Sequence, residues 1–140
     1  HVTATFYVYT NPIGKQKHFL TWDEIKEMSD AGMTIGDHTL SHPYLKKLPL
    51  DDFRREVTKS KTIIEQHIGK PVVHHTGGKN AVHFASPFGF TDADIVQILG
   101  QAGYATARTT YKGVYQDNAL RLRGILVTDS FDYFVSQLTR

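Results

Sequence analysis

Two histidines, His38 and His42, stand four residues apart in the stretch Gly-Asp-His-Thr-Leu-Ser-His, residues 36–42. Imidazole is a good ligand for zinc and related divalent ions, and two histidines at this spacing can bind one ion from a single helical turn. The chain has 8 histidines in 140 residues, so chance alone also produces such a pair. Two interpretations stay open: part of a metal site, or loop histidines with capping or surface roles.

A catalytic metal site needs a third ligand, usually a carboxylate, and an open position for water. The chain contains no cysteine, so disulfides and thiolate ligands are excluded and any metal is held by His, Asp or Glu. Between the two histidines, Thr39 and Ser41 are expected to hold the loop through hydrogen bonds from their hydroxyls to the backbone.

A second stretch that could carry chemistry is Phe-Ala-Ser-Pro-Phe-Gly, residues 84–89. Pro87 removes a backbone donor and fixes the chain, while Gly89 allows a tight turn. The backbone N–H of Phe88 could then act as an oxyanion donor, and its ring could form a wall for an apolar or sugar face. The alternative is an ordinary turn between a strand and a helix.

Three further histidines, His74, His75 and His83, raise the hypothesis of a second metal site. Because His74 and His75 are adjacent, they face opposite sides of an extended strand and do not readily share one ion. We therefore expect structural or surface roles for all three. For four aspartates at helix starts or in turns we expect capping: Asp92, Asp94, Asp117 and Asp129.

The elements that position these residues follow from hydrophobic periodicity and from helix start and stop signals. Thr21 and Glu24 form a predicted capping box. The expected elements are a strand at 1–9, a helix within 20–32, a strand at 33–35, a helix at 51–68, two short strands within 72–89, a helix between Thr91 as its cap and Gly103, strands at 104–109 and 120–127, and a last helix capped by Ser130.

This alternation of strands and helices predicts an α/β fold with a mainly parallel sheet, either open or closed into a barrel. In such folds ligands bind at the carboxyl ends of the strands. His38 and His42 follow one predicted strand and residues 84–89 follow another, so we expect both at the same rim. No linker divides the chain, and we expect a single domain over residues 1–140.

Composition excludes several classes of function. Sixteen basic and 14 acidic residues give a net charge of +2 without basic runs, which does not predict nucleic-acid binding. No stretch is long and apolar enough for a membrane span, and no signal peptide opens the chain. Residues 1–9 already have the pattern of a buried strand, so we expect the first part of the parent protein to lie upstream.

Several stretches in register resemble the polysaccharide deacetylases that share the chitooligosaccharide-deacetylase (NodB-like) homology domain. Residues 2–8, VTATFYV, resemble the second-strand pattern of the family. Residues 20–45 resemble its next helix, its Gly-Met-x-Ile-Gly strand and its His-Thr-x-x-His metal motif. FASPFG at 84–89 is similar to the Pro-Tyr/Phe-Gly motif, and residues 103–110 and 120–127 are similar to the closing strands.

The resemblance implies a distorted (β/α) barrel, incomplete at its N-terminus, and metal-dependent hydrolysis of N-acetyl, or less often O-acetyl, groups on a polysaccharide or oligosaccharide. It implies that His38 and His42 are ligands of a divalent ion, usually zinc, which activates the water that attacks the acetyl carbonyl. The Phe88 N–H matches the oxyanion donor, and residues 86–89 (Ser86, Pro87, Phe88 and Gly89) contact the substrate. It also implies a secreted or cell-envelope protein.

The chain departs from the family pattern at several positions. The Thr-Phe-Asp-Asp-Gly motif, which supplies the carboxylate ligand and the base, is absent. The only Asp-Asp pair of the sequence, Asp51-Asp52, starts a predicted helix and is not followed by glycine. The late Leu-x-His with the general acid is also absent. The arginine that many members carry before the Pro-Tyr/Phe-Gly motif would fall at Ala85, and Ser86 replaces a tyrosine of one variant.

Three hypotheses follow from these patterns. The first is a zinc-dependent carbohydrate deacetylase whose first strand precedes the sequence. The second is a non-catalytic relative that binds glycans through the same groove, which the missing motifs favour. The third is a small-molecule amidase or phosphoesterase on another α/β scaffold, which explains the histidine pair but not the other matches.

Overall fold

The computed structural model describes residues 3–69, 74–76, 79–81, 83–113, 115–124 and 135–136. Its strands are β1 (Thr5–Val8), β2 (Thr34–Asp37), β3 (His74–Thr76), β4 (Lys79–Ala81), β5 (His83–Ala85), β6 (Thr106–Lys112) and β7 (Leu122–Gly124). Its α-helices are α1 (Trp22–Asp30), α2 (Leu50–Ile68) and α3 (Ala93–Gln101). Short 3₁₀ helices lie at Leu45–Lys47, Pro87–Gly89 and Ala119–Arg121.

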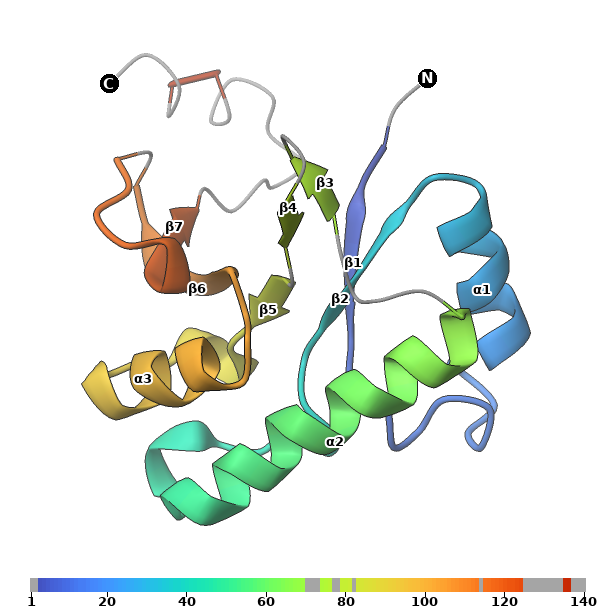
Figure 1. The fold of residues 1–140 in the computed structure, drawn as a ribbon, viewed down its shortest axis with the longest axis horizontal. Helices are drawn as coiled ribbons and strands as arrows, with labels where there is room; N and C mark the ends of the chain where they lie inside the picture. Colours follow the sequence, from blue (N-terminus) through green and yellow to red (C-terminus); the bar gives the residue numbers. More distant parts are fainter. Residues whose placement is uncertain are drawn as a thin grey trace.

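Five of these strands form one parallel sheet in the order β1-β2-β5-β6-β7. The register aligns Val8 with Asp37, Asp37 with Phe84, and Ala85 with Arg108. The carboxyl ends of β1, β2 and β5 therefore meet at one rim, as the parallel α/β prediction requires. A separate antiparallel hairpin of β3 and β4 follows α2 (Figure 1).

The helices lie beside the row of strands as an outer layer, in which α1 and α2 pack on β2 and α3 packs against α2 (Figure 1). Between α1 and α2, the rings of Trp22 and His67 stack in parallel with their centroids 4.0 Å apart. The predicted capping box of α1 is confirmed, because Thr21 accepts a hydrogen bond from the Glu24 amide while the Glu24 carboxylate accepts one from the Thr21 amide.

The hydrophobic core lies between the sheet and the helices. The apolar stripe of α2 supplies Phe53 and Val57, and the α3 stripe supplies Leu99, all essentially inaccessible to solvent. Phe84 of β5 packs edge-on between Phe53 and Tyr104, with centroid distances of 6.2 and 5.3 Å. Since Phe84 faces this core, its neighbours His83 and Ala85 face the opposite side of the sheet.

The structure corrects three local predictions. Within residues 72–89 it contains three short strands, β3, β4 and β5, where two were expected. The cap of α3 is Asp92 and not Thr91, because the Asp92 carboxylate accepts the amide of Ile95 at 2.9 Å. Strand β2 continues to Asp37, two residues beyond its predicted end. Ser130, the expected cap of the last helix, lies outside the described residues.

Candidate functional site

The two histidines of the first motif lie directly after β2, at the carboxyl rim of the sheet. Strand β2 is buried along its whole length, and the amide of His38 still donates to the carbonyl oxygen of Val8 at 3.0 Å. The strand pairing therefore fixes the backbone of His38 up to the point where the loop begins. Because Asp37 faces the helices, His38 faces the opposite side of the sheet.

The His38 imidazole has a defined orientation and tautomer. Its Nδ1 atom lies 2.7 Å from the carbonyl oxygen of Ala85 at the end of β5. A carbonyl oxygen only accepts hydrogen bonds, so Nδ1 carries the proton and Nε2 keeps its lone pair. Burial lowers the pKa of His38, and the nearby His42 lowers it further against the opposing hydrogen bond to Ala85. The neutral imidazole that binds metals is therefore favoured.

The His42 ring lies beside the His38 ring, with their centroids 4.7 Å apart. The loop that brings them together is not a helical turn, because Thr39 and His42 both have left-handed backbones, with φ of 74° and 58°. The predicted role of Thr39 is confirmed: its hydroxyl accepts a hydrogen bond from the His42 amide at 3.0 Å. Two nitrogen donors are thus close enough to approach one ion.

Asp37, which no sequence pattern singled out, anchors the loop from inside the molecule. Its fully buried carboxylate accepts hydrogen bonds from the amide of Thr39 at 2.8 Å, from the Ser60 hydroxyl at 2.7 Å and from the Tyr104 hydroxyl. Burial raises the pKa of Asp37 to about 7 although these three hydrogen bonds oppose the shift. With its oxygens engaged on the helix side, Asp37 is not a ligand candidate for an ion between the histidines.

Glu56 of α2 anchors the same loop from outside. Its carboxylate accepts hydrogen bonds from the amides of Leu40 and Ser41, at 2.9 and 3.0 Å, and from the Ser41 hydroxyl at 2.8 Å. The sequence predicted that the Ser41 hydroxyl would hydrogen-bond to the backbone. In the structure it donates to the Glu56 carboxylate instead. The sequence shows only that Glu56 lies on the polar side of an amphipathic helix. That position does not indicate which residues it contacts.

The second predicted stretch lies beside the histidines. The rings of His42 and Phe88 meet with a centroid distance of 4.8 Å, and Phe88 is 61% exposed. Phe88 and Gly89 have left-handed backbones, and a Cβ at Gly89 would overlap the side chain and amide of Thr110. The turn is thus specific to glycine at this position. The buried Ser86 hydroxyl has no hydrogen-bond partner within the described part of the chain.

A hollow of about 260 Å³ opens beside these residues, and we call it the histidine hollow. His38, Ala85 and Phe88 form one side of it, and Arg108 supplies a guanidinium. The remaining lining residues are Tyr7, Ser86, Gly89, Thr109 and Thr110. It therefore contains all of the predicted substrate-contacting positions except Pro87, which is buried. Arg108 was not anticipated, because a single arginine within a strand gives no recognisable pattern.

The described residues fit part of a metal centre. Two imidazoles, one with a fixed tautomer, supply nitrogen donors, but nowhere in the described ranges do three His, Cys, Asp or Glu side chains form a group able to hold an ion. A metal site at this pair would need a further ligand from outside these ranges. Of the other histidines, His83 approaches the Thr106 hydroxyl at 2.5 Å, whereas the side chains of His74 and His75 lie outside the described residues.

Comparison with known sequences identifies one family. A family model described as polysaccharide deacetylase matches residues 1–107. Among curated proteins, the peptidoglycan-N-acetylglucosamine deacetylase of Bacillus cereus is 30% identical over 69 residues, which are 49% of this chain and 23% of that protein.

Solved structures with the same fold include a deacetylase of Streptococcus pyogenes in complex with acetate, with a TM-score of 0.83 and 24% identity. The match covers 96% of this chain and 58% of the Streptococcus pyogenes chain. A polysaccharide deacetylase of Bacillus cereus is matched with a TM-score of 0.80 and 27% identity, over 97% of this chain and 42% of its own. The five parallel strands thus correspond to part of a deacetylase barrel domain.

A third similar structure is a pseudoenzyme of the CE4 family from Bacillus anthracis, with a TM-score of 0.61 and 24% identity over 76% of this chain and 33% of that one. The chain spans between about a quarter and three fifths of the length of the first relatives that it matches. Both active and inactive proteins therefore share this fold.

Proposed function

Because the chain belongs to the polysaccharide deacetylase family, we propose that it supplies the histidine pair of a metal-dependent deacetylase acting on N-acetyl, or O-acetyl, groups of a glycan. The observation that carries the proposal is the 2.7 Å contact between His38 Nδ1 and the Ala85 carbonyl. That contact leaves the Nε2 lone pair of His38 available, and the centroid of the His42 ring lies 4.7 Å from that of His38.

His38 and His42 would hold a divalent ion, for which zinc is the first candidate because both donors are imidazoles and the family is typically metal-dependent. When bound, such an ion polarises a carbonyl and lowers the pKa of water. The remaining ligand, a carboxylate in this proposal, comes from a segment outside the described residues. Asp37 and Glu56 hold the two histidines in place through the loop backbone.

The residues of the histidine hollow would receive the acetylated sugar. The N–H of Phe88 donates to the oxyanion that develops on the acetyl carbonyl, which favours the transition state over the ground state. The exposed Phe88 ring gives one sugar face an apolar wall, and Ser86, Pro87 and Gly89 shape the turn that holds it.

Acetate release from a defined glycan tests this proposal. The full protein, stripped with chelator, is incubated with chitohexaose or with peptidoglycan before and after addition of Zn²⁺ or Co²⁺. We expect acetate only with metal, and none from the His42→Ala variant. The exposed His18→Ala variant, which removes an imidazole elsewhere, serves as the matched control and should retain activity. Equal metal-dependent release by His42→Ala would overturn the proposal.

A second candidate is a glycan-binding protein without catalysis. It is favoured by the lack of a three-ligand group in the described ranges and by the inactive relative with the same fold. It predicts saturable chitohexaose binding with no acetate released at any metal concentration. The same incubations therefore separate the two candidates.

Glycan substrates of this kind place the protein's action in the cell envelope or outside the cell, and this is part of the proposal. The curated relative is named for peptidoglycan, a cell-wall polymer. None of the helices in the part of the chain that the structure describes is long and apolar enough to cross a membrane.

A further inference from the structure

A second hollow, of about 340 Å³, lies where β6 and β7 end. We call it the arginine hollow. It is lined by Lys112, Gly113, Tyr115, Gln116, Asp117 and Arg123. The histidine hollow includes Thr110, two residues before Lys112 on the same strand. At about 3.3 Å per residue, the two hollows follow each other within roughly 7 Å along β6.

Gly124 of β7 lies beside two residues with cationic side chains and against the guanidinium of a third. Lys112 is its register partner on β6, and Arg123 precedes it in the chain. The Arg108 guanidinium occupies the space that a side chain at position 124 would fill, since a Cβ there would overlap Nη2 of Arg108. The absent side chain thus allows Arg108 to lie between the two hollows.

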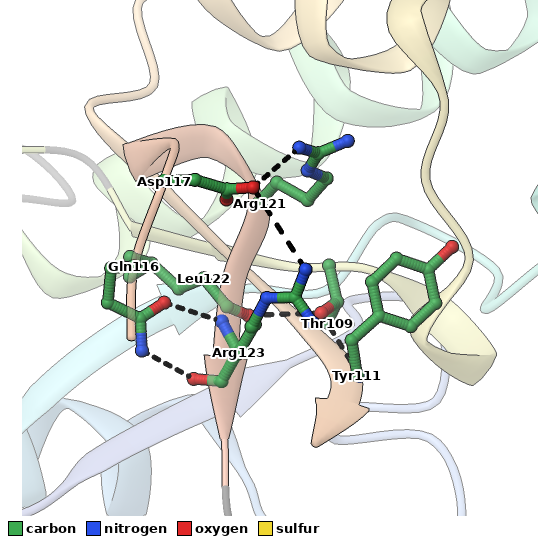
Figure 2. Close-up of polar contacts among 7 residues, drawn as sticks. All are labelled: Thr109, Tyr111, Gln116, Asp117, Arg121, Leu122 and Arg123. Atoms are coloured by element: carbon green, nitrogen blue, oxygen red, sulfur yellow. Dashed lines mark hydrogen bonds and ion pairs between the residues drawn. The ribbon is translucent and has the colours of Figure 1, made fainter. Parts of the chain in front are cut away.

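The positive charge is only partly compensated. Asp117 is the one carboxylate that lines either hollow, and it already lies 2.9 Å from Arg121 Nη2 and 4.0 Å from Arg123 Nη2 (Figure 2). Within the described residues, no carboxylate pairs with Arg108 or Lys112. Counting Arg108, Lys112 and Arg123 against Asp117, the Lys, Arg and Asp side chains that line the two hollows have a net charge of +2.

The wall of the arginine hollow is held in a fixed shape. The Gln116 side-chain amide accepts from the Arg123 amide at 2.7 Å and donates to the Arg123 carbonyl at 3.2 Å (Figure 2). Beside this clamp, Tyr115 is 83% exposed and offers an aromatic face next to the cations. An exposed aromatic ring beside charged and amide groups suits a sugar ring that carries an anionic substituent.

We propose that the two hollows form one groove for an acetylated glycan with oxyanion substituents, carboxylate or phosphate, bound by Arg108 and Lys112. This inference rests on the proposed function and adds a substrate class to it. Arg108 and Lys112 are four residues apart on β6, but the Arg108 guanidinium extends to Gly124, the register partner of Lys112, so both cations are available to one bound glycan. A polymer with an anionic group in each repeat reaches both cations.

Binding measured without metal tests the groove separately from catalysis. Hyaluronan hexasaccharide and chitohexaose form a matched pair, because both contain N-acetylglucosamine and only the first carries carboxylates. A glycerol-phosphate polymer with N-acetylglucosamine substituents tests phosphate as the anion. With the full protein in chelator at 20 mM salt, we expect an anionic glycan to bind tighter than chitohexaose, and the preference to vanish at 0.5 M salt. The stronger of the two anionic ligands identifies the substituent.

Variants assign the preference to the groove. Arg108→Gln and Lys112→Gln should each lower affinity for the anionic glycan about 1.5- to 5-fold, the range expected for exposed ion pairs. Lys112→Gln, which lies outside the histidine hollow, should leave chitohexaose binding unchanged, and Arg108→Gln should weaken the anionic glycan more than chitohexaose. Lys59→Gln removes an exposed lysine of α2 and should change neither affinity. Equal affinity for all three ligands, an equal loss in Lys59→Gln, or no binding at all would overturn the inference. Metal-dependent acetate release would still decide the proposed function.

Discussion

The Nδ1 atom of His38 lies 2.7 Å from the carbonyl oxygen of Ala85, so one strand end fixes the tautomer of an imidazole on its neighbour. Strands β2 and β5 pair at Asp37 and Phe84, which directly precede His38 and Ala85 in the chain. The same pairing that builds the sheet therefore orients the His38 imidazole and leaves its Nε2 lone pair available. The hydrogen bonds that Thr39 and Glu56 accept from the loop amides hold the backbone of His42 so that its ring lies beside that of His38.

The first prediction concerns Glu56, which receives three hydrogen bonds from the loop between the histidines. Glu56→Ala should lower zinc affinity about 10- to 100-fold, the usual effect of removing a group that orients metal ligands. Glu56→Gln, which keeps one acceptor oxygen, should show a smaller loss. Competition titration with a zinc indicator gives the affinities.

Asp51→Asn is the matched control for Glu56, because it removes an exposed carboxylate from the same helix away from the loop. Its zinc affinity should equal that of the unmodified protein. Hydrogen exchange at the Leu40 and Ser41 amides supplies a readout without metal and should quicken in Glu56→Ala only. Unchanged affinity and unchanged exchange in that variant would show that Glu56 does not position the loop.

The second prediction concerns the pH dependence of stability. The pKa of Asp37 is raised by burial from 3.8 to about 7 in the folded protein. Between these values the folded chain retains a proton that the unfolded chain has lost, so stability falls as pH rises from about 4 to 7. The fall is on the order of 4 kcal/mol from this group, at about 1.4 kcal/mol per unit of pKa.

Urea unfolding between pH 4 and 8, in chelator, measures this dependence. Asp37→Asn has no proton to lose and should show a flatter profile across that window, whatever its absolute stability. Asp30→Asn removes an exposed carboxylate that pairs with Lys26 and should retain the slope of the unmodified protein. Parallel profiles for the unmodified protein and Asp37→Asn would contradict the assignment.

The third prediction uses two glycines with left-handed backbones. Gly89→Ala should destabilise the protein by about 1–3 kcal/mol or more, because a Cβ there is strained and also overlaps Thr110. Gly32→Ala introduces the same kind of strain with no atom within 4 Å and isolates the backbone cost. Urea unfolding should show the larger loss at Gly89, and an equal loss at both positions would refute the close approach.

Much of the fold follows from patterns that the sequence displays locally. The Thr21 capping box, the apolar stripe of α2 and the β-branched strands each depend on residues a few positions apart, and the parallel order follows from their alternation. The short strands of residues 72–89 were less predictable, because three-residue strands leave almost no periodic signal.

The motif residues of the candidate site could be recognised in the sequence, whereas the residues that hold them in place could not. His38, His42 and Phe88 belong to recognisable motifs, and the structure brings their rings together. Asp37 and Glu56 act through partners 15 to 67 residues away, as in the pairs Ser41–Glu56 and Asp37–Tyr104, and Arg108 lies on a neighbouring strand. Contacts of this kind depend on how elements pack, so spacing in the sequence carries no signal for them.

X-ray absorption at the zinc edge of the full, zinc-loaded protein tests the central claim, that His38 and His42 bind one ion. We predict scattering from two imidazole rings with nitrogens at about 2.0–2.1 Å, and from one ring in either His38→Ala or His42→Ala. A spectrum without imidazole scattering, or one unchanged in both variants, would contradict the account.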